Sequence, residues 1–239
     1  MSGLIHIFLM SQSKVFIDIG NSAVKWRTKE SNVCTESVDK FLSNTLPQAD
    51  SAWVSAVANL NIVDDIKILF KEFHLVNSQK KCKNLVVAYD DPSSLGSDRF
   101  CAMLASMNQF SKKPLLVIDL GSAMTFDVID GNGLHQGGLI MPGLGALRKS
   151  FPKFEISDLS TSINTFATNT NDAWKNGTQA MLVSSINDQI KKFKEIYSDG
   201  IVTFCGGFAE EIKNELPNFV QIFDNLVLDG LECYSQTMG

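Results

Sequence analysis

Residues 14–27 read Lys-Val-Phe-Ile-Asp-Ile-Gly-Asn-Ser-Ala-Val-Lys-Trp-Arg, and residues 115–129 repeat the plan as Leu-Leu-Val-Ile-Asp-Leu-Gly-Ser-Ala-Met-Thr-Phe-Asp-Val-Ile. Each stretch is an apolar run that ends in Asp-x-Gly and a small polar residue, followed by a second strand-like run. A hairpin signal follows each copy, at residues 28–32 and 130–133. The repetition predicts a duplicated chain whose halves meet near residues 111–114.

Length and helical periodicity fit that plan. A chain of 239 residues, 44% hydrophobic, can bury a core as one large or two small domains. Helical stripes fill the intervals between strands, and strands that alternate with crossover helices indicate an α/β protein. The expected stripes are Ile62, Ile66, Leu69, Phe70 and Phe73 after a cap at Asn59 or Asn61; Phe100, Met103, Leu104 and Met107 after Ser97; and Ile186, Ile190, Phe193 and Tyr197 after Asn171.

Charge and cysteine usage exclude several classes of partner. Lys and Arg total 21 against 26 Asp and Glu, so the sequence offers no basic face for nucleic acid. The five cysteines form no CxxC pair and only three histidines accompany them, which is typical of reduced thiols in a cytoplasmic protein. The apolar residues 4–10 are too short to span a membrane. They are an N-terminal extension, or the chain starts at Met10.

Two turns are candidates for phosphate binding. A glycine directly after a strand lets backbone N–H groups approach a phosphate closely, and Gly20 and Gly121 both have this position. Asp18 and Asp119 add a carboxylate at each strand end. A single Asp-x-Gly is also ordinary turn chemistry. Two copies in duplicated strand-turn-strand contexts favour the phosphate interpretation and resemble the paired loops of the actin, sugar-kinase and Hsp70 superfamily.

That resemblance implies an α/β fold of duplicated ribonuclease H-like (actin-like) halves, each a mixed sheet with helices, facing across a nucleotide cleft. The halves are expected at residues 1–112 and 113–239. A third glycine element, Gly206-Gly207 after an apolar run, would lie against adenosine in this superfamily, or is simply a tight turn. Neither a GxxxxGK[ST] loop nor a protein-kinase HRD or DFG set is present.

The most distinctive stretch, residues 89–99, reads Tyr-Asp-Asp-Pro-Ser-Ser-Leu-Gly-Ser-Asp-Arg. Gly96 frees a turn and Ser97 can cap the following helix. Asp98 suits the positive end of the helix dipole, whereas Arg99 does not, which points to a function for the arginine. The alternative is an Asp98–Arg99 ion pair on the surface, which would contribute little.

The order of the motifs resembles that of the type III pantothenate kinases. Asp-x-Gly-Asn-Ser, Tyr…Gly-x-Asp-Arg and Asp-x-Gly-Ser-Ala-x-Thr-x-Asp are followed by Gly137-Gly138-Leu-Ile-Met-Pro-Gly and Asn169-Thr170-x-x-Ala-Trp174-x-x-Gly177. The resemblance extends from about Lys14 to about Leu228. Ser22 and Ser122 stand where many relatives have Thr, and Trp174 replaces a smaller residue, with an effect either on the pocket or on packing alone.

The resemblance implies roles for individual residues. ATP, with Mg²⁺ near Asp18, would be bound through Asp18, Ile19, Gly20, Asn21, Ser22, Ala23, Val24 and Lys25, and by Ser122 from the second turn. Asp98 would be the catalytic base, and pantothenate would contact Tyr89, Gly96, Ser97, Asp98, Arg99 and Thr170. Asp119 would hold a monovalent cation, K⁺ or NH₄⁺. Members are homodimers in which the neighbouring subunit completes the pantothenate site.

The expected function is therefore ATP-dependent phosphorylation of pantothenate to 4′-phosphopantothenate, the first step of coenzyme A biosynthesis, with a monovalent cation requirement. A sugar or amino-sugar kinase of the same superfamily would share both phosphate turns but needs a different acceptor motif. A non-catalytic accessory factor in transcription is a third interpretation. The acidic charge balance argues against direct DNA contact.

Overall fold

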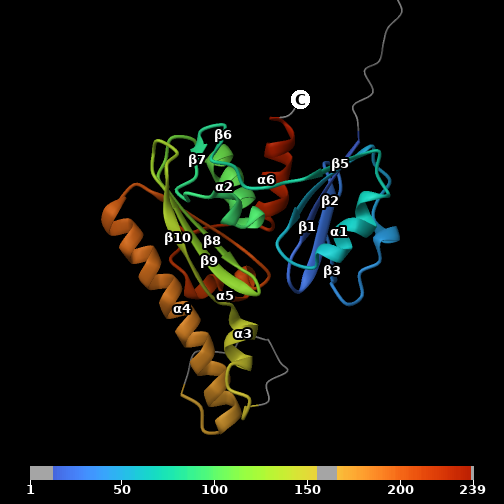
Figure 1. Cartoon of the computed structure of the whole chain (residues 1–239). Coiled ribbons are helices and arrows are strands. Elements are labelled where there is room, and N and C mark those ends of the chain that lie inside the picture. The colour runs from blue at the N-terminus through green and yellow to red at the C-terminus, as the bar shows by residue number, and fades with distance from the viewer. Residues whose placement is uncertain (1–12, 155–165, 238–239) are drawn as a thin grey trace, which may run out of the picture. The chain divides into compact units, whose positions relative to one another are not determined.

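The computed structural model describes residues 13–154 and 166–237. The chain forms two compact units, divided between Val76 and Asn77, and each unit is built on its own sheet (Figure 1). The apolar stretch at residues 4–10 lies outside the described residues.

The first unit is a mixed sheet of five strands in the order β3-β2-β1-β4-β5. β2 pairs antiparallel with both β3 and β1, and β4 and β5 run parallel to β1. The apolar side chains of β1 and β4 pack under helix α1 as the core of this unit. The elements are β1 (Lys14–Ile19), β2 (Ala23–Thr28), β3 (Cys34–Ser37), a 3₁₀ turn (Ser43–Thr45), β4 (Ser51–Ala56), α1 (Leu60–Lys67) and β5 (Glu72–Leu75).

The second unit repeats this strand order as β10-β9-β8-β11-β12. Here too β9 pairs antiparallel with both β10 and β8, and β11 and β12 run parallel to β8. The duplication expected from the two Asp-x-Gly stretches is confirmed, because each stretch forms the central hairpin of its sheet. These strands are β8 (Leu115–Leu120), β9 (Ala123–Ile129), β10 (His135–Pro142), β11 (Ile201–Cys205) and β12 (Gln221–Ile222).

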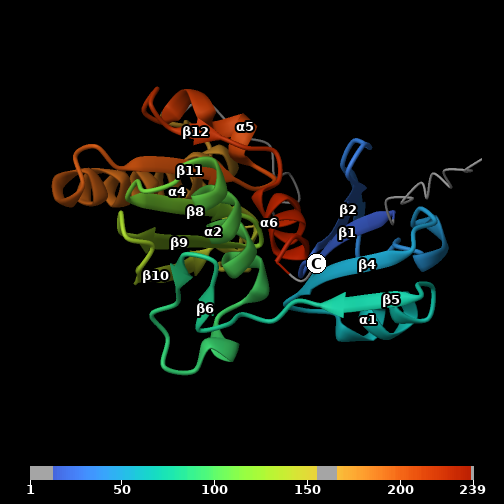
Figure 2. The same ribbon diagram turned by 90° about the horizontal axis from the view of Figure 1, so that it is seen from above.

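Helices cover both faces of the second sheet (Figure 2). Alternate residues of β8, beginning with Leu116, pack against α4 and α5, while α2 and α6 pack together on the opposite face. The helices are α2 (Ser97–Gln109), α3 (Leu144–Lys149), α4 (Thr170–Ile196), α5 (Ala209–Ile212) and α6 (Leu226–Ser235). A small hairpin of β6 (Lys81–Cys82) and β7 (Leu85–Val86) and two 3₁₀ turns (Pro92–Ser94, Lys213–Glu215) complete the unit.

Helix α1 differs from its expected form. It ends at Lys67, so Leu69 and Phe70 lie beyond it and Phe73 belongs to β5. Asn59 stands at the cap position but makes no side-chain cap bond, because its backbone is left-handed, with a φ of 53°. Its amide instead donates to the carbonyl of Gly20 at 2.8 Å. The asparagine therefore secures the turn after β1 rather than the helix start.

Helix α2 follows the first sheet in the chain, as α6 follows the second, yet it packs on α6 and β8. The two helix backbones approach closely, since a Cβ on Gly230 would lie 1.9 Å from the carbonyl oxygen of Cys101. This packing explains why the contacts divide the chain at residue 76 rather than after α2. The division into 1–112 and 113–239 stays a prediction about the duplicated copies.

Candidate active site

The first predicted phosphate turn joins β1 to β2. The N–H of Gly20 donates to the carbonyl of Ala23 at 3.0 Å, which closes the turn. Asp18 lies directly opposite Lys25 on β2 and Ser55 on β4, so the three side chains share one face of the sheet. Within residues 18–25, Ile19 and Val24 are completely buried, so they can offer a ligand only their backbone.

The second predicted phosphate turn, Gly121-Ser122, joins β8 to β9, and Asp119 ends the preceding strand. Two glycine turns press against this loop. A Cβ on Gly143 would lie 2.2 Å from the Gly121 carbonyl oxygen, and one on Gly206 would lie 2.2 Å from that of Leu120. Gly206 therefore packs against the second predicted phosphate turn, a contact that the sequence interpretation as an adenosine turn did not include.

The stretch predicted to bind pantothenate, residues 89–99, leads into α2, and side-chain hydrogen bonds hold its backbone. Ser78 Oγ donates to the carbonyl of Leu95 at 2.8 Å, and the carboxylate of Asp91 caps the 3₁₀ turn by accepting from Ser93 N–H at 3.0 Å. Gly96 is the cap residue of α2, and Ser97, expected as the cap, is its first helical residue. These bonds hold the backbone that precedes Asp98.

Asp98 lies in the first turn of α2, and its carboxylate accepts the backbone N–H of Arg99 at 2.7 Å. Burial raises the pKa of Asp98 above its ordinary value, against the lowering effect of the hydrogen bond and charge of Arg99; the nearby charge of Asp127 adds to the rise. A carboxylate in this setting binds a proton more readily than an ordinary aspartate, which suits a proton acceptor.

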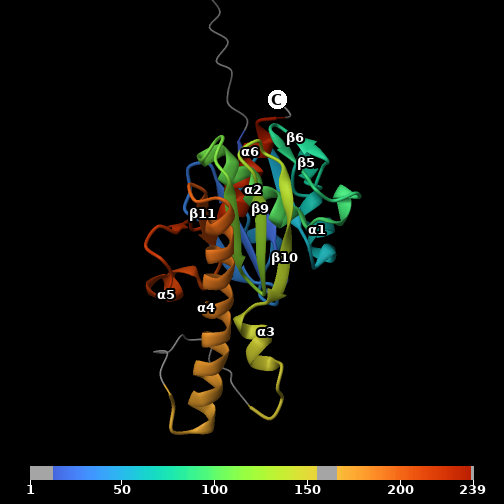
Figure 3. The ribbon, with the colours of Figure 1, turned by 90° about the vertical axis from the view of Figure 1, so that its left-hand side faces the viewer.

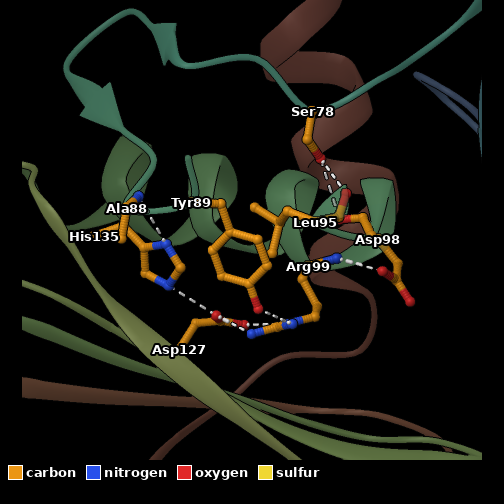
Figure 4. Close-up of polar contacts among 9 residues, drawn as sticks. Ser78, Ala88, Tyr89, Leu95, Asp98, Arg99, Asp127 and His135 are labelled. Carbon is orange, nitrogen blue, oxygen red and sulfur yellow. Dashed lines mark hydrogen bonds and ion pairs between the residues drawn. The ribbon is translucent and has the colours of Figure 1, made fainter. Parts of the chain in front are cut away.

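Arg99 is buried and pairs with Asp127 of β9, not with Asp98 (Figure 4). Its Nε donates to Asp127 Oδ2 at 2.9 Å and its Nη2 to Oδ1 at 2.6 Å, while Nη1 donates to the hydroxyl of Tyr89 at 3.1 Å. Burial opposes the charge of Arg99, but Asp127 outweighs burial and raises the pKa of the guanidinium. The surface ion pair considered for Asp98 and Arg99 is therefore wrong.

His135 extends this arrangement on the other side of Asp127. Its ring is completely buried; Nδ1 faces the N–H of Ala88 at 3.4 Å, and Nε2 lies 3.0 Å from Asp127 Oδ1. Because the backbone N–H can only donate, Nδ1 accepts and the proton of a neutral ring sits on Nε2, from which it is donated to the carboxylate.

Two glycines of β10 lie next to the pair, and one of them, Gly138, makes room for it. The register of β10 against β9 shifts between His135 and Gly137, and Gly137 has a φ of +102°. Gly138 then lies opposite Asp127, and a Cβ there would come within 2.4 Å of Arg99 Nη2 and 2.5 Å of Asp127 Oδ1. The Gly-Gly motif thus has a steric reason: a larger residue at 138 would displace the buried ion pair.

The structure gathers five of the six predicted acceptor residues, Tyr89, Gly96, Ser97, Asp98 and Arg99, around the start of α2. Thr170 is separate, because it begins α4 at the end that projects away from the second sheet (Figures 1 and 3). Sequence reasoning gave no role to Asp127 or His135. The sequence offered little signal for either residue. Asp127 is the last residue of the Asp-x-Gly-Ser-Ala-x-Thr-x-Asp motif, and His135 is one of three histidines.

Trp174 packs locally in this chain. Its ring lies 5.0 Å from that of Phe154 and 6.0 Å from that of Phe151, and its Nε1 donates to the carbonyl of Arg148 at 3.1 Å. Trp174, which stands where relatives have a smaller residue, therefore joins α4 to the segment after α3. It does so as part of an aromatic cluster, Phe151, Phe154 and Trp174.

Two features are absent from the part of the chain that the structure describes. Within residues 13–154 and 166–237, no three His, Cys, Asp or Glu side chains are grouped as metal ligands. No helix of those ranges combines the length and apolar character needed to cross a membrane.

Comparison with solved structures identifies the fold. A Baf family transcriptional activator from Campylobacter jejuni has a TM-score of 0.62 at 22% identity, covering 93% of this chain and 97% of that one. MreB 5 of Spiroplasma citri, bound to AMPPNP, has a TM-score of 0.53 at 11% identity, covering 95% and 97%. At such identities these likenesses concern the fold alone. The actin-like class, with two ribonuclease H-like halves, is confirmed.

Comparison of sequences identifies the family. The model of the type III pantothenate kinase family matches residues 14–192. The type III pantothenate kinases of Alcanivorax borkumensis and Colwellia psychrerythraea are 28% and 29% identical to this chain. The alignments cover 91% and 92% of this chain and 96% and 99% of those relatives. Together with the motif order and the site around α2, these matches show that the chain belongs to the type III pantothenate kinase family.

Proposed function

We propose that this protein transfers the γ-phosphoryl group of ATP to the primary hydroxyl of pantothenate, giving 4′-phosphopantothenate for coenzyme A biosynthesis. Family membership supports the reaction. The observation that carries it is the neighbourhood of Asp98 and Arg99 at the start of α2, where a carboxylate with a raised pKa adjoins a buried guanidinium. The first group suits an alcohol and the second a carboxylate, and pantothenate has both.

Asp98 orients the hydroxyl for in-line attack on the γ-phosphorus and ends as the acceptor of its proton. An aspartate is too weak a base to deprotonate an alcohol before attack. Phosphoryl transfer passes through a loose transition state, so alignment matters most and the proton leaves late. The raised pKa of Asp98 helps it to retain that proton afterwards.

Arg99 and Tyr89 hold the carboxylate of pantothenate. Among the described residues, three of the five guanidinium N–H groups bond to Asp127 and Tyr89. One N–H on Nη1 and one on Nη2 are left for a ligand, and donors on the two nitrogens suit the two oxygens of a carboxylate. Gly96 and Ser97 shape the turn beside them.

ATP is bound through residues 18–25 and Ser122, with cations completing the site. Mg²⁺ commonly takes one or two protein carboxylates together with phosphate oxygens and water, so Asp18 suffices without a three-ligand cluster. Asp119, with Thr125 opposite it on β9, offers oxygen ligands suited to K⁺ or NH₄⁺. When bound, these cations would offset the negative charge of the phosphates, which in other kinases is offset by a Walker lysine that this chain lacks.

A homodimer completes the acceptor site. Thr170 begins α4 at the end that projects away from the second sheet, whereas Arg99 belongs to α2, which supports its supply by a second copy (Figure 3). The aromatic cluster of Phe151, Phe154 and Trp174 lies on the same projecting end, and the Phe151 side chain is half exposed. An exposed cluster of this kind is typical of a protein interface.

We expect the wild-type protein to sediment with twice its chain mass of 26.3 kDa and Phe151→Asp to sediment as a monomer with reduced pantothenate turnover. The charge would be buried against the second copy without a partner. Sedimentation equilibrium makes the measurement, with Ile68→Asp as the control, since Ile68 is an exposed apolar residue of the other unit. A monomeric wild type that is fully active would contradict the dimer.

The direct test of the function is a coupled ADP-release assay with purified protein, ATP, Mg²⁺ and pantothenate, run with K⁺ and again with only Na⁺. Turnover should require both pantothenate and K⁺. Turnover with only Na⁺ present would reject the proposal that Asp119 holds a required K⁺ or NH₄⁺ ion, but the proposed pantothenate kinase activity would stand. No pantothenate-dependent turnover in either buffer would reject the substrate and lead to a panel of sugars.

Two further interpretations have less support. A sugar kinase would share the fold, yet the residues around Arg99 suit an anionic acceptor better than a neutral sugar. A role as an accessory factor in transcription is supported here by the name of one structure of similar fold, the Baf family protein. A cytoplasmic location belongs to the same proposal, supported by the finding that no disulfide joins the five cysteines, all of which lie in the described ranges.

A further inference from the structure

We propose that Asp127 is a positioning residue for the acceptor: supported by His135, it fixes the orientation in which Arg99 presents its last two N–H groups to the substrate carboxylate. This inference rests on the proposed function and adds two residues to its machinery, neither of which touches the reacting atoms.

The first argument is the geometry of the ion pair. Asp127 takes the Nε and Nη2 edge of the guanidinium with bonds of 2.9 and 2.6 Å. The guanidinium is planar and its donors have fixed directions, so two bonds along one edge determine where the others point. Asp127 therefore fixes the directions of the donors on Nη1 and Nη2, and the Tyr89 hydroxyl accepts one of the two N–H groups of Nη1.

The second argument is that Asp127 itself cannot turn. Its side chain is 2% exposed, and Oδ1 accepts from both Arg99 and His135. The tautomer of His135 is set in turn by the N–H of Ala88, so the ring donates to the carboxylate. A carboxylate with both oxygens engaged and no room to change rotamer is a rigid support for the arginine.

The third argument is that the hydrogen bonds form a closed ring, which Figure 4 shows. From the backbone of Ala88 it passes to His135, Asp127 and Arg99, and returns to the hydroxyl of Tyr89, the next residue in the chain. The Tyr89 and His135 rings also lie nearly parallel, 6.0 Å apart. Loosening Asp127 therefore disturbs both groups assigned to the substrate carboxylate, Arg99 and Tyr89.

The absence of a side chain at position 138 fits the same conclusion. Gly138 stands opposite Asp127, and a methyl group there would contact both members of the pair. The β10 strand thus leaves the space in which Asp127 and the guanidinium of Arg99 meet.

The test compares two acceptors: pantothenate, and the alcohol in which a CH₂OH group replaces its carboxylate. We expect Asp127→Asn to raise the KM for pantothenate by about tenfold or more, with the KM values for the alcohol and for ATP changed less than about threefold. His135→Phe should shift the pantothenate KM in the same direction by a smaller factor. His135→Gln should partly restore it, because its amide can again donate to Asp127.

A double-variant cycle separates positioning from general stability. If Asp127 acts through Arg99, Arg99→Gln and the double variant Arg99→Gln with Asp127→Asn should have the same pantothenate KM, because the second change has nothing left to misplace. If Asp127→Asn does not fold, the His135→Phe and His135→Gln pair gives the same readout with the ion pair intact.

Several outcomes would overturn the inference. Equal losses with pantothenate and the alcohol would mean a structural role alone. A lower KM for pantothenate in Asp127→Asn would mean that Asp127 competes with the substrate for Arg99. Unchanged kinetics in the Asp127 and His135 variants, with an active wild type, would reject the inference and keep the function. A wild type that turns over the alcohol but not pantothenate, or neither acceptor, would reject both.

Discussion

Asp98→Asn is expected to lower kcat for pantothenate by about 10²-fold or more while ATP is still bound. Asparagine has nearly the same shape as aspartate, so the start of α2 and the positions of Arg99 and Tyr89 should persist. The amide cannot accept the proton of the attacking hydroxyl, and its NH₂ group donates where the carboxylate accepted. The measurement is steady-state kinetics together with ATP binding by calorimetry.

The pH dependence of kcat should identify the same group. Asp98 has to be ionised to accept a proton, and its pKa is raised above the ordinary value of 3.8. As the pH is lowered, kcat should therefore begin to fall at a higher pH than it would for an aspartate with an ordinary pKa. The pH profile of Asp98→Asn should lack this acidic fall. Wild-type turnover by Asp98→Asn would contradict the assignment.

The same substitution is expected to stabilise the fold near neutral pH. Because burial raises the pKa of Asp98 in the folded state, its protonated form is favoured there, and the advantage is lost as pH rises through the folded pKa. Asparagine is neutral at every pH, so its melting temperature should exceed that of the wild type at pH 7 and converge with it below about pH 4. The control is Asp65→Asn on the exposed face of α1, whose melting temperature should equal that of the wild type.

Gly206→Ala is expected to lower the free energy of unfolding by about 3 kcal/mol and to raise the KM for ATP by about tenfold or more. The φ of Gly206 is +116°, a backbone conformation that an L-residue with a side chain rarely adopts. A Cβ there would also lie 2.2 Å from the carbonyl oxygen of Leu120. Leu120 directly precedes Gly121, so relief of the clash has to move the second phosphate turn.

The matched control is Gly131→Ala, in the turn between β9 and β10. A Cβ at Gly131 would make only ordinary contacts, the nearest at 3.6 Å, and no left-handed backbone is required. Denaturant unfolding and ATP kinetics should leave this variant close to the wild type. If Gly206→Ala lost stability without any change in the KM for ATP, the support of the second phosphate turn by Gly206 would be wrong.

The sequence by itself determined the duplicated plan and the start of α2. The two Asp-x-Gly stretches form the central hairpin of each sheet, because an apolar run, a glycine turn and a second run are local signals that need no distant partner. For the same reason residues 96–99 could be assigned to a helix start. The motif order sufficed for the family, since it depends on residue types and spacing alone.

Local signals failed where the outcome depended on packing. The apolar stripe predicted a helix as far as Phe73. Phe73 instead lies in β5, opposite Ala52 of β4, where it packs against the core of the first unit. Helix α2 likewise packs on α6 and the second sheet, a choice that its own sequence does not reveal.

The partner of Arg99 was decided only by the tertiary structure. The sequence analysis considered its neighbour Asp98 as an alternative partner, whereas Asp127 lies 28 residues further on. The pair forms because the β9–β10 register sets Gly138 opposite Asp127, which leaves space beside the sheet for a buried guanidinium. A buried charge needs a partner at close range, and only the assembled sheet brings one there.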